Sequence, residues 1–337
     1  MIEEGSVTNE VLKWVESERK NILEEERKLL EEIPERIGHV LKDGVDFNDE
    51  HNKRALDKAA EVLKIILEER LDAAKRLEQR RGLRLSAIGT HCPRKLWFSV
   101  NNPDAAEELE PEVRLKFLYG DIIEVLVLFL LELAGYEVSD QQKEVAFEGV
   151  VGHIDAILEG RCVVDVKSAS TFSMRKFRDG ISDTNDPFGY KSQLYAYASA
   201  LDMPCAAFIA VDKQHGKIIV DTHNVTKNDT DVLRERIELI RNVCQSPTPP
   251  PIPYKFLGNT KKQIPVECRY CQFKFECYPT LTVYQKSDGS KEYYPCPQNR
   301  KKIQNVTREL KEKLLREKKE RVEKRKRLAQ KKKDQEE

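Results

Sequence analysis

Two short stretches decide the fold: Gly152-His153-Ile154-Asp155 and, shortly after it, Asp165-Val166-Lys167. They lie within residues 150–158 and 162–166, two runs rich in Val, Ile and Leu. A glycine turn separates the runs, which is the pattern of a β-hairpin. Burying an unpaired acid in a strand is costly, so such acids need a partner. A hard divalent cation with oxygen ligands is a common one.

Asp165 and Lys167 share one face of the predicted strand, because side chains alternate with a period of two. A lysine two residues after a metal-binding acid suits hydrolysis of a phosphodiester. The metal polarises a water, and the ammonium orients it or offsets the charge that develops on the phosphorane. Taken alone, Asp-x-Lys also fits a solvated strand edge with no function, so its surroundings must decide.

The register of the hairpin determines whether one metal can reach both acids. A two-residue turn would place Asp155 opposite Val164 and the acids on opposite faces. We therefore predict a three-residue turn, Glu159-Gly160-Arg161 with Gly160 left-handed, or a bulge near Asp155. Either would pair Asp155 with Asp165.

Two predicted helices flank the hairpin in the sequence. Tyr119-Gly120-Asp121-Ile122-Ile123-Glu124 opens an apolar helix that runs to about Leu133, with Glu124 near its first turn. In a second helix, residues 187–201, Gln193 and Tyr197 stand i,i+4 on one face. The order of acid on a helix, Gly-x-x-Asp, Asp-x-Lys and Gln-x-x-x-Tyr resembles the PD-(D/E)XK nuclease superfamily, particularly its RecB-like branch.

The resemblance covers roughly residues 85–280 and implies a restriction-endonuclease-like α/β core, a mixed sheet flanked by helices. It implies Mg²⁺ or Mn²⁺ as the metal. The implied roles are metal ligation by Asp155 and Asp165, catalysis by Lys167, and positioning of DNA by Gln193 and Tyr197. Glu124 occupies a place where relatives often have histidine, and we keep it as a further metal ligand.

Three cysteines near the end of the globular part form a C-x2-C-x5-C pattern: Cys268, Cys271 and Cys277. They supply three soft ligands and lack a fourth, for which Cys92 is the natural candidate and Cys296 a substitute. One cysteine before the nuclease motifs and three after them resembles the iron-sulfur subset of RecB-like nucleases, the AddB-type and CRISPR-associated nucleases.

That resemblance implies a [4Fe-4S] cluster. Spacing alone leaves zinc open, because four thiolates suit zinc equally well. A disulfide framework is not expected in a cytosolic chain of this size. The remaining thiols are interpreted as core or surface residues: Cys162, Cys205 and Cys244.

Composition places the chain among soluble proteins: 34% of its 337 residues are charged and 39% hydrophobic. No run approaches the length of a membrane span and no signal peptide is evident, so we expect a cytoplasmic protein without membrane contact. The net charge is zero but unevenly spread. Residues 1–80 carry 15 basic and 21 acidic side chains, and residues 301–337 carry 16 and 8.

Residues 9–42 and 50–81 have apolar residues at helical spacing, with Gly44 and Asn48-Asp49 between them as breaker and cap. They predict a helical hairpin in which Pro34 kinks or splits the first helix. It is either a brace on the core or an arm for a homo-oligomer or a helicase or recombination partner. We expect three parts: this hairpin within residues 1–84, the nuclease domain with its iron-sulfur segment over 85–280, and a basic helical or disordered tail over 281–337.

The function expected is a metal-dependent DNA exonuclease acting on single strands or duplex ends, in recombination, repair or phage-type DNA processing. The alternative is a catalytically weak DNA-binding or structural subunit of a helicase, recombination or CRISPR-adaptation complex. Residues 168–186 are predicted to be a polar loop, whose basic side chains are available to a phosphate backbone: Arg175, Lys176 and Arg178. The basic tail offers a further DNA contact by counterion release. No G-x-x-x-x-G-K-[ST] motif is present, so unwinding would need a partner.

Overall fold

A computed structural model of the chain describes residues 17, 20–72, 82–253, 264–286 and 291–295. The chain forms two compact units, Met1–Pro253 and Tyr254–Glu337. Cys296, the 301–337 tail and the outer ends of the two predicted N-terminal helices lie outside the described residues. Among the residues described, no helix combines the length and apolar character that crossing a membrane requires.

The first unit is built on a mixed five-stranded sheet in the order β1-β4-β5-β6-β7. Strands β5 and β6 are parallel, and the other neighbours are antiparallel. The central strand β5 is buried along most of its length, which explains its nearly continuous apolar sequence. The strands are β1 Val138–Ser139, β4 Ala156–Leu158, β5 Cys162–Ala169, β6 Cys205–Asp212 and β7 Ile218–Asn224.

The predicted first strand, residues 150–158, is wrong as a single strand. It divides into β3, Val150–His153, and β4, with Ile154 and Asp155 between them. β3 pairs with β2, Glu144–Phe147, in a separate two-stranded sheet, and only β4 pairs with β5. The local apolar pattern could not reveal the break, because the break arises from the pairing of β3 with β2, a strand outside the pattern.

The three-residue turn is confirmed. Leu158 pairs with Cys162, which leaves Glu159, Gly160 and Arg161 in the turn. Both Glu159 and Gly160 are left-handed, with φ of 53° and 63°. The same register pairs Ala156 with Val164 and directs the chain before Ala156 toward Asp165.

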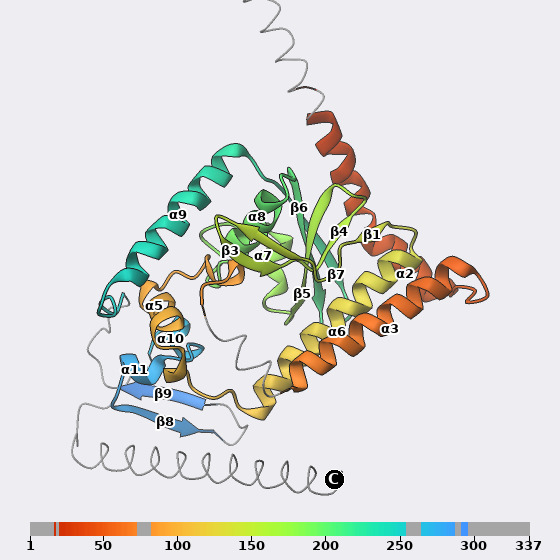
Figure 1. Cartoon of the computed structure of the whole chain (residues 1–337). Helices are drawn as coiled ribbons and strands as arrows, with labels where there is room; N and C mark the ends of the chain where they lie inside the picture. The colour runs from red at the N-terminus through yellow and green to blue at the C-terminus, as the bar shows by residue number, and fades with distance from the viewer. Residues whose placement is uncertain (1–16, 18–19, 73–81, 254–263, 287–290, 296–337) are drawn as a thin grey trace, which may run out of the picture. The chain divides into compact units, whose positions relative to one another are not determined.

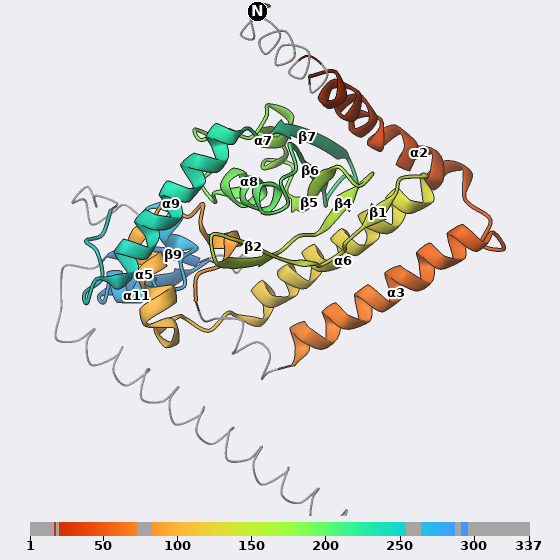
Figure 2. The same cartoon turned by 45° about the horizontal axis from the view of Figure 1, so that its top comes forward.

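Helices cover both faces of the sheet (Figures 1 and 2). One apolar core lies between the sheet and α2 and α6, and the other lies between the sheet and α7, α8 and α9. In both views α3 runs along α6. The helices are α2 Ile33–Asp43, α3 Glu50–Leu71, α5 Pro93–Asn101, α6 Pro111–Leu133, α7 Met174–Arg178, α8 Tyr190–Ala200 and α9 Lys227–Gln245.

Two expectations about these helices are wrong. Helix α6 begins at Pro111 rather than Tyr119, so Glu124 lies in its middle and not in its first turn. Residues 168–186 are not a plain loop, because they contain α7, which buries Met174 and Phe177. The start of α6 mixes charged residues with exposed apolar ones such as Leu115 and Phe117, so it shows no one-sided helical pattern, and in α7 charged residues concealed the helix.

The N-terminal helices pack on the core as a brace. A helix over residues 20–31 breaks at Glu32, next to Pro34, and α2 then buries Ile33 and Ile37. Gly44 ends α2, and the Asp49 side chain caps α3 by accepting hydrogen bonds from two backbone amides. These breaks agree with the sequence prediction.

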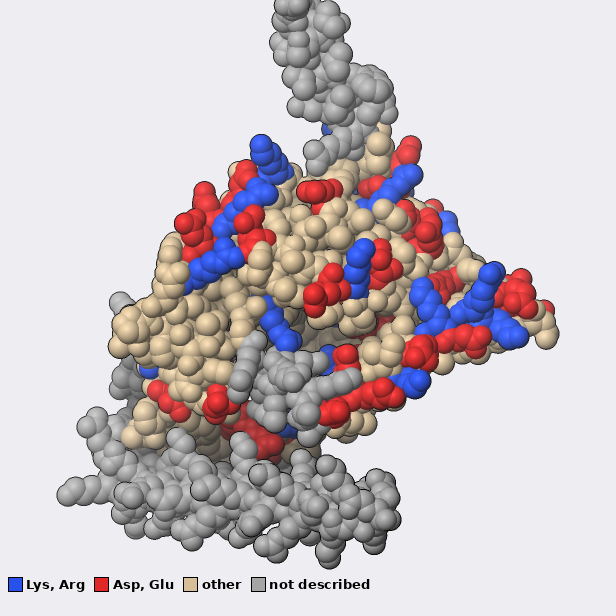
Figure 3. Space-filling view, in the orientation of Figure 1, with Lys and Arg blue, Asp and Glu red and all other residues tan. Residues whose placement is uncertain are grey.

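Polar contacts fix α3 on α6. The guanidinium of Arg70 donates two hydrogen bonds of 2.8 Å to the carboxylate of Asp121. Figure 3 shows acidic and basic side chains mixed along α3 and α9, rather than one sign gathered in a patch. The ion pairs between neighbouring turns, such as Lys64 with Glu61, agree with that distribution.

The second unit has a small core of its own around Ile264, Cys268 and Leu281. It contains two short helices, α10 Val266–Arg269 and α11 Lys274–Cys277. A hairpin of β8 Leu281–Gln285 and β9 Lys291–Pro295 follows. The helical or disordered tail predicted from residue 281 therefore begins instead with strands.

Candidate active site

The Asp-x-Lys motif lies in the middle of β5, on the face that α8 covers. The side chain of Asp165 is 1% exposed and that of Lys167 is 20% exposed. The ammonium of Lys167 forms an ion pair with Asp165 Oδ2. The two residues therefore share a strand face, as their spacing predicts, and the lysine balances a buried carboxylate.

Gln193 and Tyr197 extend this cluster from α8. Gln193 Nε2 donates to Asp165 Oδ1 at 3.2 Å and to the Tyr197 hydroxyl at 3.3 Å. Gly152 makes room for the tyrosine: a Cβ at this position would lie 2.7 Å from Tyr197 Cε1 and 2.8 Å from Leu85 Cβ. The glycine of Gly-x-x-Asp is therefore required by packing against Tyr197.

Asp155 reaches the same place from the break between β3 and β4. Its Oδ2 accepts a 2.7 Å hydrogen bond from the backbone amide of Val166, the residue between Asp165 and Lys167. Glu124 approaches from the middle of α6, and its Oε1 accepts a hydrogen bond from Gln142. The structure thus brings the sequence-predicted acids to the vicinity of Lys167 from three elements.

Electrostatics show how closely these charges interact. Burial raises the pKa of Asp155 well above its usual range, and the charges of Glu124 and Asp165 raise it further. Burial, followed by the charge of Asp165, raises the pKa of Glu124 to about 7. Burial also raises the pKa of Asp165, against the opposing effect of Lys167. Removing three acids from water beside one another destabilises their charged forms.

For Lys167 the surroundings favour the charged form, unlike for the three acids. Burial alone would lower its pKa, but the carboxylates of Asp165 and Asp155 outweigh burial and raise it. The side chain therefore remains an ammonium at neutral pH. A permanent cation is suited to stabilising phosphate charge and not to accepting a proton.

The donor chemistry fits a hard divalent cation, because carboxylate oxygens are the ligands that Mg²⁺ and Mn²⁺ prefer and the crowded acids need a counter-charge. The grouping is not preformed. Within the described ranges, no three His, Cys, Asp or Glu side chains are arranged to hold a metal ion. A complete three-carboxylate site would require Glu124, Asp155 or Asp165 to change position.

Sequence reasoning missed Tyr190, the first residue of α8. Lys167 Nζ lies 5.1 Å from the centroid of its ring, and Lys176 Nζ lies 4.1 Å from the same centroid. Desolvation lowers the pKa of Lys176 to about 8, and the nearby charge of Lys167 adds to this effect although Asp186 opposes it. An aromatic residue at a predicted helix start gave no signal of this contact.

The four predicted cluster ligands lie in both units. In the first unit Cys92 caps α5, and its sulfur accepts a 3.4 Å hydrogen bond from the amide of Lys95. In the second unit Cys271 accepts a 3.4 Å hydrogen bond from the amide of Phe273. Cys268 lies in α10 and Cys277 ends α11. Amide donors to sulfur suit thiolate ligands, but these residues too belong to the described part in which no metal-binding group of three is formed.

The other thiols behave as the sequence predicts. Cys162 and Cys205 are buried core residues, paired in register on β5 and β6. Cys244 is partly buried near the end of α9.

Comparison with known proteins gives distant structural likenesses. No protein-family profile and no curated protein matches the sequence. The protein SSO0001 is 19% identical over 66% of this chain and 96% of its own, with a TM-score of 0.37. An alkaline exonuclease from Laribacter hongkongensis, LHK-Exo, is 9% identical over 46% of this chain and 88% of its own, with a TM-score of 0.30. A phage-related exonuclease from Haemophilus somnus 129PT is 17% identical over 32% and 60%, with a TM-score of 0.28. These scores are too low to assign a function, which must be argued from the site.

Proposed function

We propose that this protein is a metal-dependent nuclease of the RecB-like PD-(D/E)XK type that hydrolyses phosphodiester bonds of DNA. The observation that carries the proposal is the cluster of three acids and one lysine at β5, with Gln193 and Tyr197 beside it. Buried charges of this kind add little to stability. Strongly perturbed carboxyl groups held next to a fixed cation are instead typical of catalytic sites.

Each side chain has a role that its surroundings support. Asp155 and Asp165, with Glu124, would hold the divalent cation, which when bound supplies a polarised water for attack on phosphorus. Lys167 is oriented by its ion pair with Asp165 and by the ring of Tyr190. Its ammonium would offset the negative charge that develops on the phosphoryl oxygens.

Gln193 and Tyr197 would position Asp165 and the DNA strand. Gln193 holds Asp165 and Tyr197 through one amide group, so it fixes both a metal ligand and a neighbouring hydroxyl. Together they would orient the DNA strand and keep Asp165 in place, and their loss should slow cleavage less than loss of Lys167.

The substrate we propose is single-stranded DNA or a duplex end, as for the exonucleases that the motif order resembles, in recombination, repair or phage-type DNA processing. We also propose that Cys92, Cys268, Cys271 and Cys277 bind a [4Fe-4S] cluster. The cysteine layout and the amide donors to the sulfurs of Cys92 and Cys271 support this proposal.

The test compares cleavage of end-labelled linear and circular single-stranded DNA in Mn²⁺. The variant Lys167→Ala should cleave at least about 100-fold more slowly than the wild type, because it lacks a charge that acts in the transition state. Lys143→Ala is the matched control, since it removes an exposed lysine paired with Asp140. Circular DNA should resist cleavage if the enzyme needs an end.

Cleavage by Lys167→Ala at the wild-type rate would remove the nuclease assignment. A wild-type protein that binds DNA without cutting it in Mg²⁺ or Mn²⁺ would favour the alternative, a DNA-binding or structural subunit of a larger complex.

A further inference from the structure

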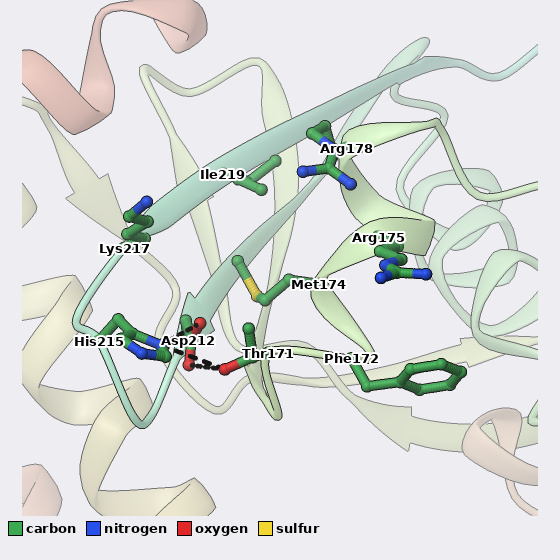
Figure 4. A pocket seen from close by; sticks show the side chains of 9 residues that line it. All are labelled: Thr171, Phe172, Met174, Arg175, Arg178, Asp212, His215, Lys217 and Ile219. Atoms are coloured by element: carbon green, nitrogen blue, oxygen red, sulfur yellow. Dashed lines mark hydrogen bonds and ion pairs between the residues drawn. The ribbon is translucent and has the colours of Figure 1, made fainter.

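A further cavity lies on the side of the sheet that α7 covers, and its lining does not include Glu124, Asp155 or Asp165. It is a cavity of about 620 Å³ between α7 and the turn that joins β6 to β7. That volume lies within the range of sites that bind small organic ligands. Figure 4 shows Met174 and Arg178 of α7 facing the side chains of β7 and of the turn across the cavity.

Among the charged side chains of the lining, cations outnumber acids. Arg175, Arg178 and Lys217 contribute cations, and Asp212 is the acid in this lining. Asp212 is 3% exposed, and its carboxylate already accepts hydrogen bonds from the hydroxyl of Thr171 at 3.2 Å and from the amide of Gln214 at 2.9 Å.

His215 also approaches the Asp212 carboxylate, with its Nδ1 3.1 Å from Oδ2 (Figure 4). These local partners hold the carboxylate at the turn, and the lining carries three cations against this one acid. The cavity is therefore suited to an anion.

An aromatic side chain stands at the rim of the cavity. The side chain of Phe172 is among the most exposed large hydrophobic ones in the described ranges, at 79%. Arg175 lies beside it, with Cζ 5.7 Å from the ring centroid, and Figure 4 shows both side chains pointing the same way. An exposed ring next to cations is the arrangement on which nucleic-acid bases stack.

Helix α7 links this cavity to the candidate active site. Arg175 and Arg178 line the cavity, whereas Lys176 points to the ring of Tyr190, which Lys167 also contacts. Arg175, Lys176 and Arg178 all belong to α7, a helix of five residues. Lys167 is linked to them because it contacts the same Tyr190 ring as Lys176. Arg175 lies between Phe172 and Arg178 in the sequence, so a strand that runs along α7 would meet Phe172, Arg175 and Arg178 in that order or its reverse.

We propose that this cavity binds one nucleotide of a single-stranded nucleic acid, at a position flanking the bond that is cut. The arginines and Lys217 take its phosphate, and the ring of Phe172 stacks on its base. This inference rests on the proposed nuclease function, because it defines where that enzyme holds the rest of its substrate strand.

Binding is measured by fluorescence anisotropy with a short fluorescein-labelled oligothymidylate, in EDTA so that metal-dependent cleavage does not occur. Phe172→Ala should weaken binding about tenfold. It should leave binding of an abasic oligonucleotide of the same length unchanged, because that strand has no base to stack.

The double variant Arg175→Ala/Arg178→Ala should weaken binding of both strands. It should also lower the slope of log Kd against log salt by about 0.7, since the two arginines share one phosphate contact and each such contact on a single strand contributes about 0.7. The matched control, Lys53→Ala/Lys64→Ala, removes two exposed charges from α3 and should bind like the wild type.

The proposal is overturned if Phe172→Ala binds the oligothymidylate as the wild type does, or if the double arginine variant keeps the salt slope of its control. It is also overturned if excess thymidine monophosphate binds in the cavity but Phe172→Ala and Arg175→Ala/Arg178→Ala leave the affinity for the oligothymidylate unchanged. These results do not depend on cleavage, so a protein that fails to cut DNA still tests the cavity.

Discussion

Replacing Lys167 by methionine should destabilise the protein strongly, and replacing Asp165 by asparagine at the same time should restore most of the loss. Asp165 is 1% exposed and Lys167 balances its charge. Methionine keeps the length of the side chain against Tyr190 but leaves the carboxylate unpaired. A buried charge without its partner costs about 3–5 kcal/mol. The double variant has neither charge and should remain within about 1 kcal/mol of the wild type.

The pH dependence of this loss has a definite sign. Burial already raises the pKa of Asp165, and Lys167 opposes that rise. Without the lysine the folded-state pKa rises further above the unfolded one. The folded protein then holds a proton that the unfolded chain releases, so stability is kept at acid pH and lost as pH rises through the folded pKa. The difference in the free energy of unfolding between Lys167→Met and the wild type should therefore be largest at neutral pH. It should become smaller as the pH is lowered toward the ordinary pKa of an aspartate.

Urea unfolding followed by circular dichroism, in EDTA and across this pH range, measures all four proteins of the cycle. The reasoning is refuted if Lys167→Met at neutral pH loses no more stability than the double variant, or if its loss does not change with pH. Either result would mean that Asp165 finds another partner when Lys167 is gone.

Three further outcomes are expected. Burial and the charge of Asp165 raise the pKa of Glu124 from 4.5 to about 7. The free energy of unfolding of the wild type, measured in EDTA, should therefore fall by up to about 3 kcal/mol as the pH rises over that interval, and Glu124→Gln should make this fall smaller. Gly152→Ala should lower stability by about 1–3 kcal/mol through its clash with Tyr197, whereas Gly38→Ala, in a helix with open space around it, should raise the melting temperature slightly. Protein purified without oxygen should be brown and bleach with dithionite, and stoichiometric zinc without iron in metal analysis would contradict the [4Fe-4S] proposal.

Much of the sheet could be predicted from the sequence, because burial leaves a local pattern. Strand β5 reads as an apolar run interrupted by Asp165 and Lys167, and β6 and β7 flank an evident turn. The three-residue turn followed from one requirement, that Asp155 and Asp165 lie side by side. Two arguments therefore succeeded: the alternation of side chains along a strand, and the requirement that two acids reach one metal ion. Both hold where a strand is equally buried along its whole length.

The failures share a physical cause, which is that the deciding contact is distant in sequence. Helix α6 extends back to Pro111 through exposed residues whose helical state depends on the whole helix. Helix α7 has too few apolar residues to show a period, and it is fixed by burial of Met174 and Phe177 beneath it. The contact of Lys167 and Lys176 with Tyr190 joins three elements and leaves no trace in local spacing.

The Gly-x-x-Asp motif shows what the correct spacing encodes. It spans the passage between two sheets: Gly152 belongs to β3, which pairs with β2, and Asp155 stands just before β4, which pairs with β5. Gly152 must lack a side chain so that Tyr197 can pack on the backbone. Ile154 and Asp155 carry the chain from one sheet to the other, and the Asp155 carboxylate accepts a hydrogen bond from the amide of the residue between Asp165 and Lys167. The spacing is therefore a property of the crossing between sheets, and inserting one residue after Gly152 should separate Asp155 from Asp165 even if both strands still form.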